Sequence, residues 1–194
     1  MNESASLLVK REISDAELAK LIGGAKNDDA VAMEQLSRYV YPRIYRYIYY
    51  RVSHREDAED LTSEVVLKMV QSLKKQNGNF HAWIYKIARN AVIDLYRRRA
   101  VRSEVSLSEM PGEIPDKSVA VSEDVLTKEK LRQGLLTLTE EQRQVILLKF
   151  IEGYSNDEIA KVMGKSVGAI KLLQFRALKS MRNYFRKKGH EIKD

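Results

Sequence analysis

The chain has 194 residues, of which 44% are hydrophobic and 31% are charged, so it can form one large or two small globular domains. It contains no cysteine, and its three histidines share no helical spacing, which excludes disulfides and thiolate zinc sites and argues against a histidine metal site. No stretch approaches the roughly 18 apolar residues of a membrane span, and the N-terminus lacks the order of a signal peptide. We therefore expect a cytoplasmic protein without a membrane span of its own.

The net charge of +7 is concentrated in two segments. Residues 160–194 carry ten Lys or Arg against two acidic residues, and residues 86–102 carry six against Asp94 alone. Such clusters suit the phosphate backbone of nucleic acids, although a solvated helix face has the same composition.

The chain divides at a stretch that holds Pro111, Gly112 and Pro115. We expect an N-terminal extension that is partly helical (1–27), a helical bundle (28–100), an acidic linker (101–130), a second helical domain (131–187) and a basic tail (188–194). The predicted fold class is all-α, with two small helical domains joined by an acidic flexible linker.

In the first domain, apolar residues from Ala32 to Tyr50 predict a helix that Pro42 bends or interrupts. Its tyrosines could stack on nucleic-acid bases, but their helical spacing favours packing. Ser53 and Glu56 form a capping-box pattern ahead of an apolar repeat at every fourth position: Leu61, Val65, Met69 and Leu73. The acidic residues in the first turn of that helix also suit the helix dipole, which by itself would be enough to explain them.

After a turn at residues 76–79, a third helix starts at Phe80 and has an apolar stripe that ends at Leu95. Its other side combines Trp83 with Lys86 and Arg89. A basic face with an aromatic side chain, entered from a polar loop, is typical of a surface for separated DNA strands.

The second domain has the spacing of a helix-turn-helix. Capping-box patterns begin at Thr139 and Ser155, and Ser166 caps a third helix. Ala160, Gly164 and Ile170 provide a small contact residue, a turn with positive φ and a shared core residue, although an ordinary helical hairpin could do the same. In the third helix, an inward face of Val167, Ile170, Leu173, Ala177, Leu178 and Met181 leaves Lys171 and Arg176 as the main candidates for DNA contact.

These segments, in this order, resemble the extracytoplasmic-function (ECF) sigma factors of bacterial RNA polymerase. DAEDLTSEVVLKM (57–69) resembles region 2.2, FHAWIYKIARNAVIDLYRRR (80–99) resembles regions 2.3 and 2.4, and LTEEQRQVILLKFIEGYSNDEIAKVMGKSVGAIKLLQFRALKSMR (138–182) resembles region 4. The resemblance spans most of residues 28–185 and predicts a sigma region 2 bundle followed by a sigma region 4 helix-turn-helix.

The resemblance implies three binding surfaces. The surface for core polymerase, on the clamp coiled coil of its largest subunit, comprises Asp57, Glu59, Asp60, Leu61 and Glu64. The surface for the separated minus-ten strand comprises Asn77, Asn79, Phe80, His81, Trp83, Lys86, Arg89, Asn90 and Arg97. The surface for the minus-thirty-five duplex comprises Lys165, Ser166, Ala169, Lys171, Leu172, Phe175, Arg176 and Lys179.

The implied function is promoter-specific initiation of transcription, with core RNA polymerase (clamp coiled coil and flap), promoter DNA and an anti-sigma factor as partners. Neither a cofactor nor a metal is expected, and we expect no enzymatic activity. The alternative is a helix-turn-helix regulator that binds duplex DNA without forming a holoenzyme. Two departures from the common pattern stand out: Ser63 replaces a frequent glutamine, and Leu172, Leu173 and Gln174 replace a more usual Ser, Arg and Leu. The second departure means that no promoter sequence can be carried over from the family.

The function also requires that the two DNA-binding surfaces can be separated. If they pack face to face, a switch must part them before the protein can bind a promoter.

Overall fold

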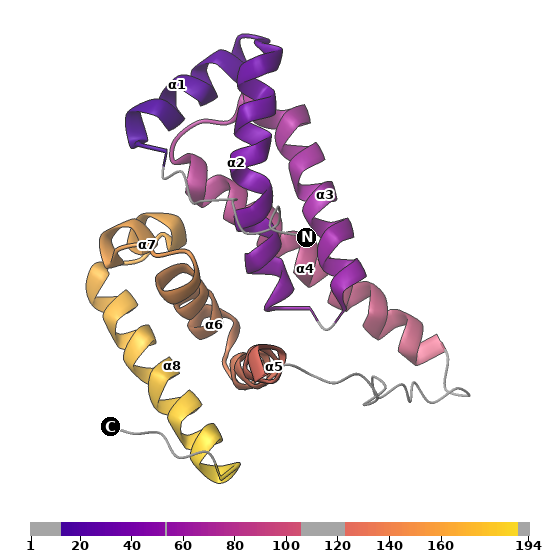
Figure 1. The fold of residues 1–194 in the computed structure, drawn as a ribbon, viewed down its shortest axis with the longest axis vertical. Coiled ribbons are helices and arrows are strands. Elements are labelled where there is room, and N and C mark those ends of the chain that lie inside the picture. The colour runs from indigo at the N-terminus through magenta and orange to yellow at the C-terminus, as the bar shows by residue number, and fades with distance from the viewer. Residues whose placement is uncertain (1–12, 53, 106–122, 190–194) are drawn as a thin grey trace, which may run out of the picture.

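The computed structural model describes residues 13–52, 54–105 and 123–189, which form helices and no strand (Figure 1). The helices group into two units. The first unit contains α1 (Asp15–Lys26), α2 (Ala30–Tyr49), α3 (Arg55–Ser72), the 3-10 turn η1 (Leu73–Lys75) and α4 (Phe80–Val105). The second unit contains α5 (Glu123–Leu136), α6 (Glu140–Ile146), the π-helical turn η2 (Leu147–Ile151), α7 (Asn156–Met163) and α8 (Val167–Lys187).

The first unit is a bundle built on the predicted apolar stripes. Leu61, Val65, Met69 and Leu73 are all buried, and α3 packs against both α2 and α4. The packing role predicted for the tyrosines is confirmed at Tyr47, which is fully buried. Pro42 lies inside α2, which continues past it to Tyr49.

Two features at the ends of this bundle differ from the expectation or lie beyond it. The predicted cap Ser53 is outside the described residues; His54 stands at the N-cap of α3 and makes no side-chain capping bond. Residues 15–26 of the predicted extension form α1, which Ser14 caps through a capping box with Glu17 and which packs on α2. The first unit therefore begins earlier in the chain than residue 28.

The second unit has the predicted helix-turn-helix. Thr139 and Ser155 form capping boxes with Gln142 and Glu158, and Ser166 accepts a hydrogen bond from the Ala169 amide. Gly164 ends α7 with φ +64°, a backbone conformation that is strained for any residue with a Cβ. Ala160 and Ile170 are buried at the crossing of α7 and α8, as the spacing predicts.

Helical structure reaches into both ends of the predicted linker, because α4 continues to Val105 and α5 begins at Glu123. The acidic segment between them, residues 106–122, is outside the described residues. No helix in the part of the chain that the structure describes is both long and apolar enough to cross a membrane.

The two units are in contact, with α2 against η2 and α4 against α7. We call this the closed arrangement. Its buried apolar residues form one continuous cluster that runs through both units.

Candidate nucleic-acid interface

More than half of the nine residues predicted to hold the minus-ten strand converge on one cavity of about 450 Å³. Five of them line it: Asn77, Asn79, Trp83, Lys86 and Arg89. The turn with Gly78 at φ +80° precedes α4, and the Asn79 side chain accepts a hydrogen bond from the Ala82 amide at 2.8 Å. The loop and the first turns of α4 thus place amide, indole and cationic groups side by side, the set that a nucleotide needs.

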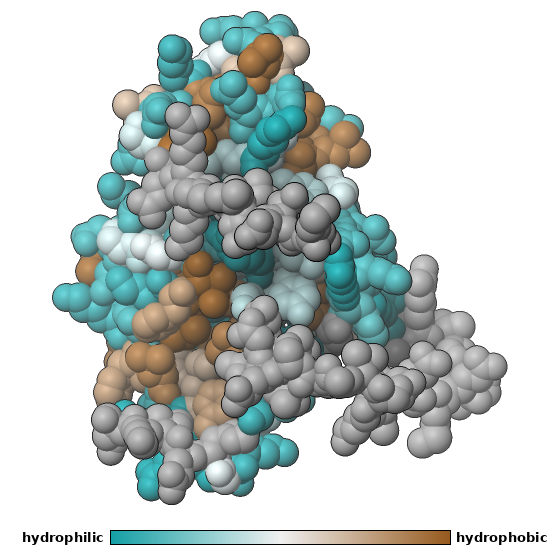
Figure 2. All heavy atoms as spheres, viewed as in Figure 1, coloured by the Kyte–Doolittle hydropathy of each residue, from teal (hydrophilic) through white to brown (hydrophobic). Residues whose placement is uncertain are grey.

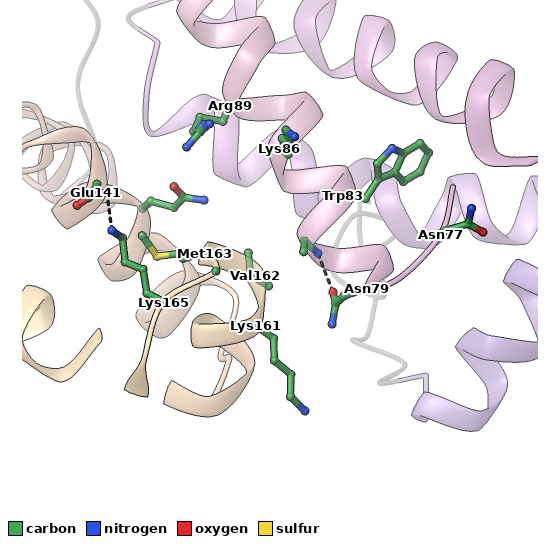
Figure 3. A pocket seen from close by; sticks show the side chains of 13 residues that line it. Asn77, Asn79, Trp83, Lys86, Arg89, Glu141, Lys161, Val162, Met163 and Lys165 are labelled. Atoms are coloured by element: carbon green, nitrogen blue, oxygen red, sulfur yellow. Dashed lines mark hydrogen bonds and ion pairs between the residues drawn. The ribbon is translucent and has the colours of Figure 1, made fainter. Parts of the chain in front are cut away.

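The opposite wall of this cavity belongs to the second unit (Figure 3). Glu141 and Gln144 from α6 and residues 161–165 at the end of α7 line this wall. Lys165 pairs with Glu141 at 2.8 Å, whereas the Nε atom of Arg89 is buried and has no hydrogen-bond partner among the described residues. Four basic residues and the single acidic Glu141 line the cavity, which therefore has a net positive charge, and one of its donors has no partner.

Other predicted minus-ten residues have different surroundings. Phe80 is buried in the core, so its side chain is not on the surface. Asn90 and Arg97 are exposed farther along α4 and are not among the residues that line the cavity. His81 packs against Tyr154 of the second unit, with ring centroids 5.3 Å apart, and contacts the hydroxyl of Tyr39 at 3.3 Å. The pKa of this histidine is lowered mainly by burial and, to a smaller extent, by the positive charge of Arg43.

Two ion pairs between the units involve residues that no sequence pattern singled out. Arg46 of α2 donates two hydrogen bonds to the carboxylate of Glu152, at 3.0 and 2.9 Å, and the Glu152 side chain is only 1% exposed. Arg51, with a side chain that is 0% exposed, donates to Tyr47 and to Glu140 of α6. These pairs join positions 106 and 89 residues apart, so no local pattern could reveal them.

The predicted polymerase-binding residues lie on α3. Asp60 and Glu64 are exposed, Glu59 pairs with Arg55, and Asp57 pairs with Arg99 of α4 at 2.6 Å. Leu61, by contrast, is 3% exposed and belongs to the core, so its burial does not support a direct contact with a partner. An acidic strip remains on the outer side of α3.

The predicted minus-thirty-five residues lie on or just before α8. Lys171, Leu172, Phe175, Arg176 and Lys179 are all exposed, and Ile170, Ala177 and Met181 are buried as expected. The prediction that Leu178 faces inward is wrong, because this side chain is 45% exposed. Figure 2 shows hydrophobic residues beside α8 with hydrophilic ones around them.

Comparisons with known proteins agree with both units. The chain matches the model for sigma-70 region 2 over residues 36–102 and the model for sigma-70 region 4 over residues 128–181. The chain therefore belongs to the sigma-70 family.

The relatives narrow this to the ECF group. The chain is 37% identical to the ECF RNA polymerase sigma factor BldN of Streptomyces coelicolor over 174 residues, which are 86% of this chain and 65% of that protein. It is 29% identical to the ECF sigma factor SigE of Mycolicibacterium smegmatis, across 93% of this chain and 72% of that protein. Among solved structures, CnrH in complex with the cytosolic domain of CnrY superposes with a TM-score of 0.68 at 24% identity, over 89% of this chain and 99% of that one. This last match supports the fold.

Proposed function

We propose that this chain binds core RNA polymerase and directs initiation at specific promoters. In this role the first unit holds the separated minus-ten strand and the second binds the minus-thirty-five duplex. One observation carries the proposal: a single cationic cavity gathers Trp83, two asparagines and two cations from the turn before α4 and its first turns. The protein would act where the chromosome is, in the cytoplasm, and would perform no catalysis itself.

The two units carry chemical groups that suit different states of promoter DNA. Stacking on an aromatic side chain is worth about 1–3 kcal/mol per base and is open only to an unpaired base, because a paired base is already stacked. Duplex DNA instead accepts a helix in its major groove, held by cations on the phosphates. The first unit offers an indole in a cavity and the second offers a cationic helix, so each suits a different state of the promoter.

The closed arrangement imposes a condition on this function. Tyr154 covers His81, and the second unit forms one wall of the cavity. A strand that continues on both sides of a bound base cannot enter between the units while they touch. We infer that the protein must open between α4 and α7 when it binds a promoter.

The test is transcription from fragments of the native genome by core polymerase with and without the purified chain. A sigma factor will convert the core enzyme into one that starts at defined sites. A helix-turn-helix regulator, the alternative function, will bind duplex fragments and give no initiation by core polymerase.

We also propose an anti-sigma factor as a partner. Solved structures similar to this chain include a co-crystal structure of the sigma factor RpoE with the anti-sigma factor NepR from Bartonella quintana. Purification of the tagged chain from its native cell, followed by identification of bound proteins and their effect on initiation, tests this proposal. A chain that is free and constitutively active there would contradict it.

A further inference from the structure

The outer side of α8 combines exposed apolar side chains with an unbroken positive charge. Its 21 residues contain no Asp or Glu, and its basic residues are Lys171, Arg176, Lys179, Arg182, Arg186 and Lys187. Leu172 is 48% exposed and Phe175 is 65% exposed on the same helix. Exposure of large apolar side chains to water is unfavourable, so two neighbouring ones on a charged helix call for an explanation.

The positions of these two side chains match the part of a recognition helix that enters DNA. The two residues are three positions apart, so they are neighbours on one face, while Ile170 and Ala177 hold the opposite face in the core. Phe175 is the ninth residue of α8, which places it about 12 Å from the first residue of the helix. Both side chains therefore lie within the first three turns, flanked by Lys171, Arg176 and Lys179.

The chemistry of the groove identifies what such side chains can contact. In the major groove of DNA the C5 methyl of thymine is the one apolar group on a base edge, and apolar side chains, including Phe, pack against it. A protein partner with an apolar helix could also cover the stripe. The absence of any acidic residue on α8 favours a polyanion, because the cations next to the stripe attract phosphates, repel basic partners and gain no charge–charge attraction from neutral ones.

We infer that Leu172 and Phe175 read thymine methyl groups in the minus-thirty-five duplex. This inference rests on the proposed function and adds a specificity to it. It also gives a role to the departure from the common family pattern at residue 172, where this chain exposes the hydrocarbon of Leu172 in place of a more usual serine. The preferred duplex must then carry thymines in the footprint of α8.

The experiment is a scan in which each thymine of a bound promoter is replaced by deoxyuridine, which removes only the methyl group. Binding of the holoenzyme is measured for each duplex. At one or two positions the wild-type protein is expected to lose about 4-fold in affinity, since burying one methyl-sized group is worth about 0.8 kcal/mol. Phe175→Ala and Leu172→Ala should each lose the dependence on its own methyl.

Leu178→Ala is the matched control. Leu178 is an exposed apolar residue of the same helix, but it is the twelfth residue of α8, about 16 Å from the first residue and beyond the first three turns, so this variant should keep the full methyl dependence. A holoenzyme that initiates from its promoter but shows no methyl dependence at any thymine overturns the inference and leaves the proposed function intact. The inference also fails if Phe175→Ala and Leu172→Ala leave DNA binding unchanged and only weaken the binding of a protein partner. Absence of initiation by the wild-type protein would instead refute the proposed function.

Discussion

The ion pair between Arg46 and Glu152 allows the closed arrangement to be tested by one substitution. Glu152→Gln keeps the size of the side chain and removes its charge. In the closed arrangement the Arg46 guanidinium then loses its carboxylate partner, whereas in an open arrangement it is solvated in either protein. The substitution should therefore shift the equilibrium toward the open form.

The size of the shift follows from the burial of the pair. Removing one partner of a fully buried ion pair costs about 3–5 kcal/mol, and exposed pairs contribute about 0–1 kcal/mol. The Glu152 side chain is 1% exposed and that of Arg46 is 40% exposed, so the pair lies between these limits. We expect a loss of about 2 kcal/mol, which is a change of about 30-fold in the ratio of closed to open protein.

The absence of native cysteine makes the measurement direct. Spin labels on introduced cysteines at Lys68 and Lys187, one in each unit and both exposed, report the distance between the units by electron paramagnetic resonance. Glu152→Gln should increase the population at long distances, and less protein should then be needed to saturate transcription by core polymerase. Glu34→Gln is the control, because Glu34 pairs with Arg38 within α2.

Two results would refute this reasoning. One is an unchanged distance distribution in Glu152→Gln, which would mean that the pair does not hold the units together. The other is a longer distance without any gain in transcription at limiting protein, which would mean that opening is not required for function. A double-mutant cycle with Arg46→Gln measures the coupling itself, and the double variant should open no further than either single variant.

Three further predictions concern single sites. Burial is the main cause that lowers the pKa of His81 below its ordinary 6.5, and Tyr154 of the second unit contributes to that burial. The closed form therefore favours the neutral ring, should be most stable above about pH 6.5, and should open as the pH falls below this value. His81→Gln should remove this pH dependence from the spin-label distances. Gly164→Ala should lower the free energy of unfolding in urea by about 1 kcal/mol, because its φ is +64° and no atom crowds the added Cβ, so only backbone strain acts. Trp83→Ala should reduce strand opening, followed by permanganate reactivity of unpaired thymines, by about 10-fold while leaving binding of a minus-thirty-five duplex unchanged.

Local signals in the sequence were sufficient for most of the helices and for most of their buried faces. The spacing from Leu61 to Leu73 and the capping boxes at Thr139 and Ser155 depend on residues within one or two turns, and the structure confirms them. The convergence of Trp83, Lys86 and Arg89 on one cavity also follows from their neighbourhood on α4.

The contact between the units was beyond the reach of local patterns. Arg51 is an ordinary basic residue in the sequence, yet its side chain is fully buried, and burial lowers its pKa. Its carboxylate partner comes from α6, and only the three-dimensional arrangement brings the two together. Leu178 was misplaced for a related reason: the helical period gives a face, but the width of the buried stripe depends on what packs against it.

In the closed arrangement one of the two proposed DNA surfaces is covered and the other is exposed, and this difference suggests an order of events. His81 is covered by Tyr154 and the cavity at Trp83 has a wall from each unit, whereas Lys171, Leu172 and Phe175 remain exposed on α8. Under the proposed function, a closed protein could therefore contact a duplex through α8, whereas a continuous strand could enter only after the units part. In this proposal, duplex binding would contribute free energy without requiring the units to part, while capture of the unpaired strand would require the loss of the Arg46–Glu152 and Arg51–Glu140 ion pairs between them. Promoter recognition by α8 should thus precede opening, and a change that weakens the contact between the units should improve strand capture more than duplex binding.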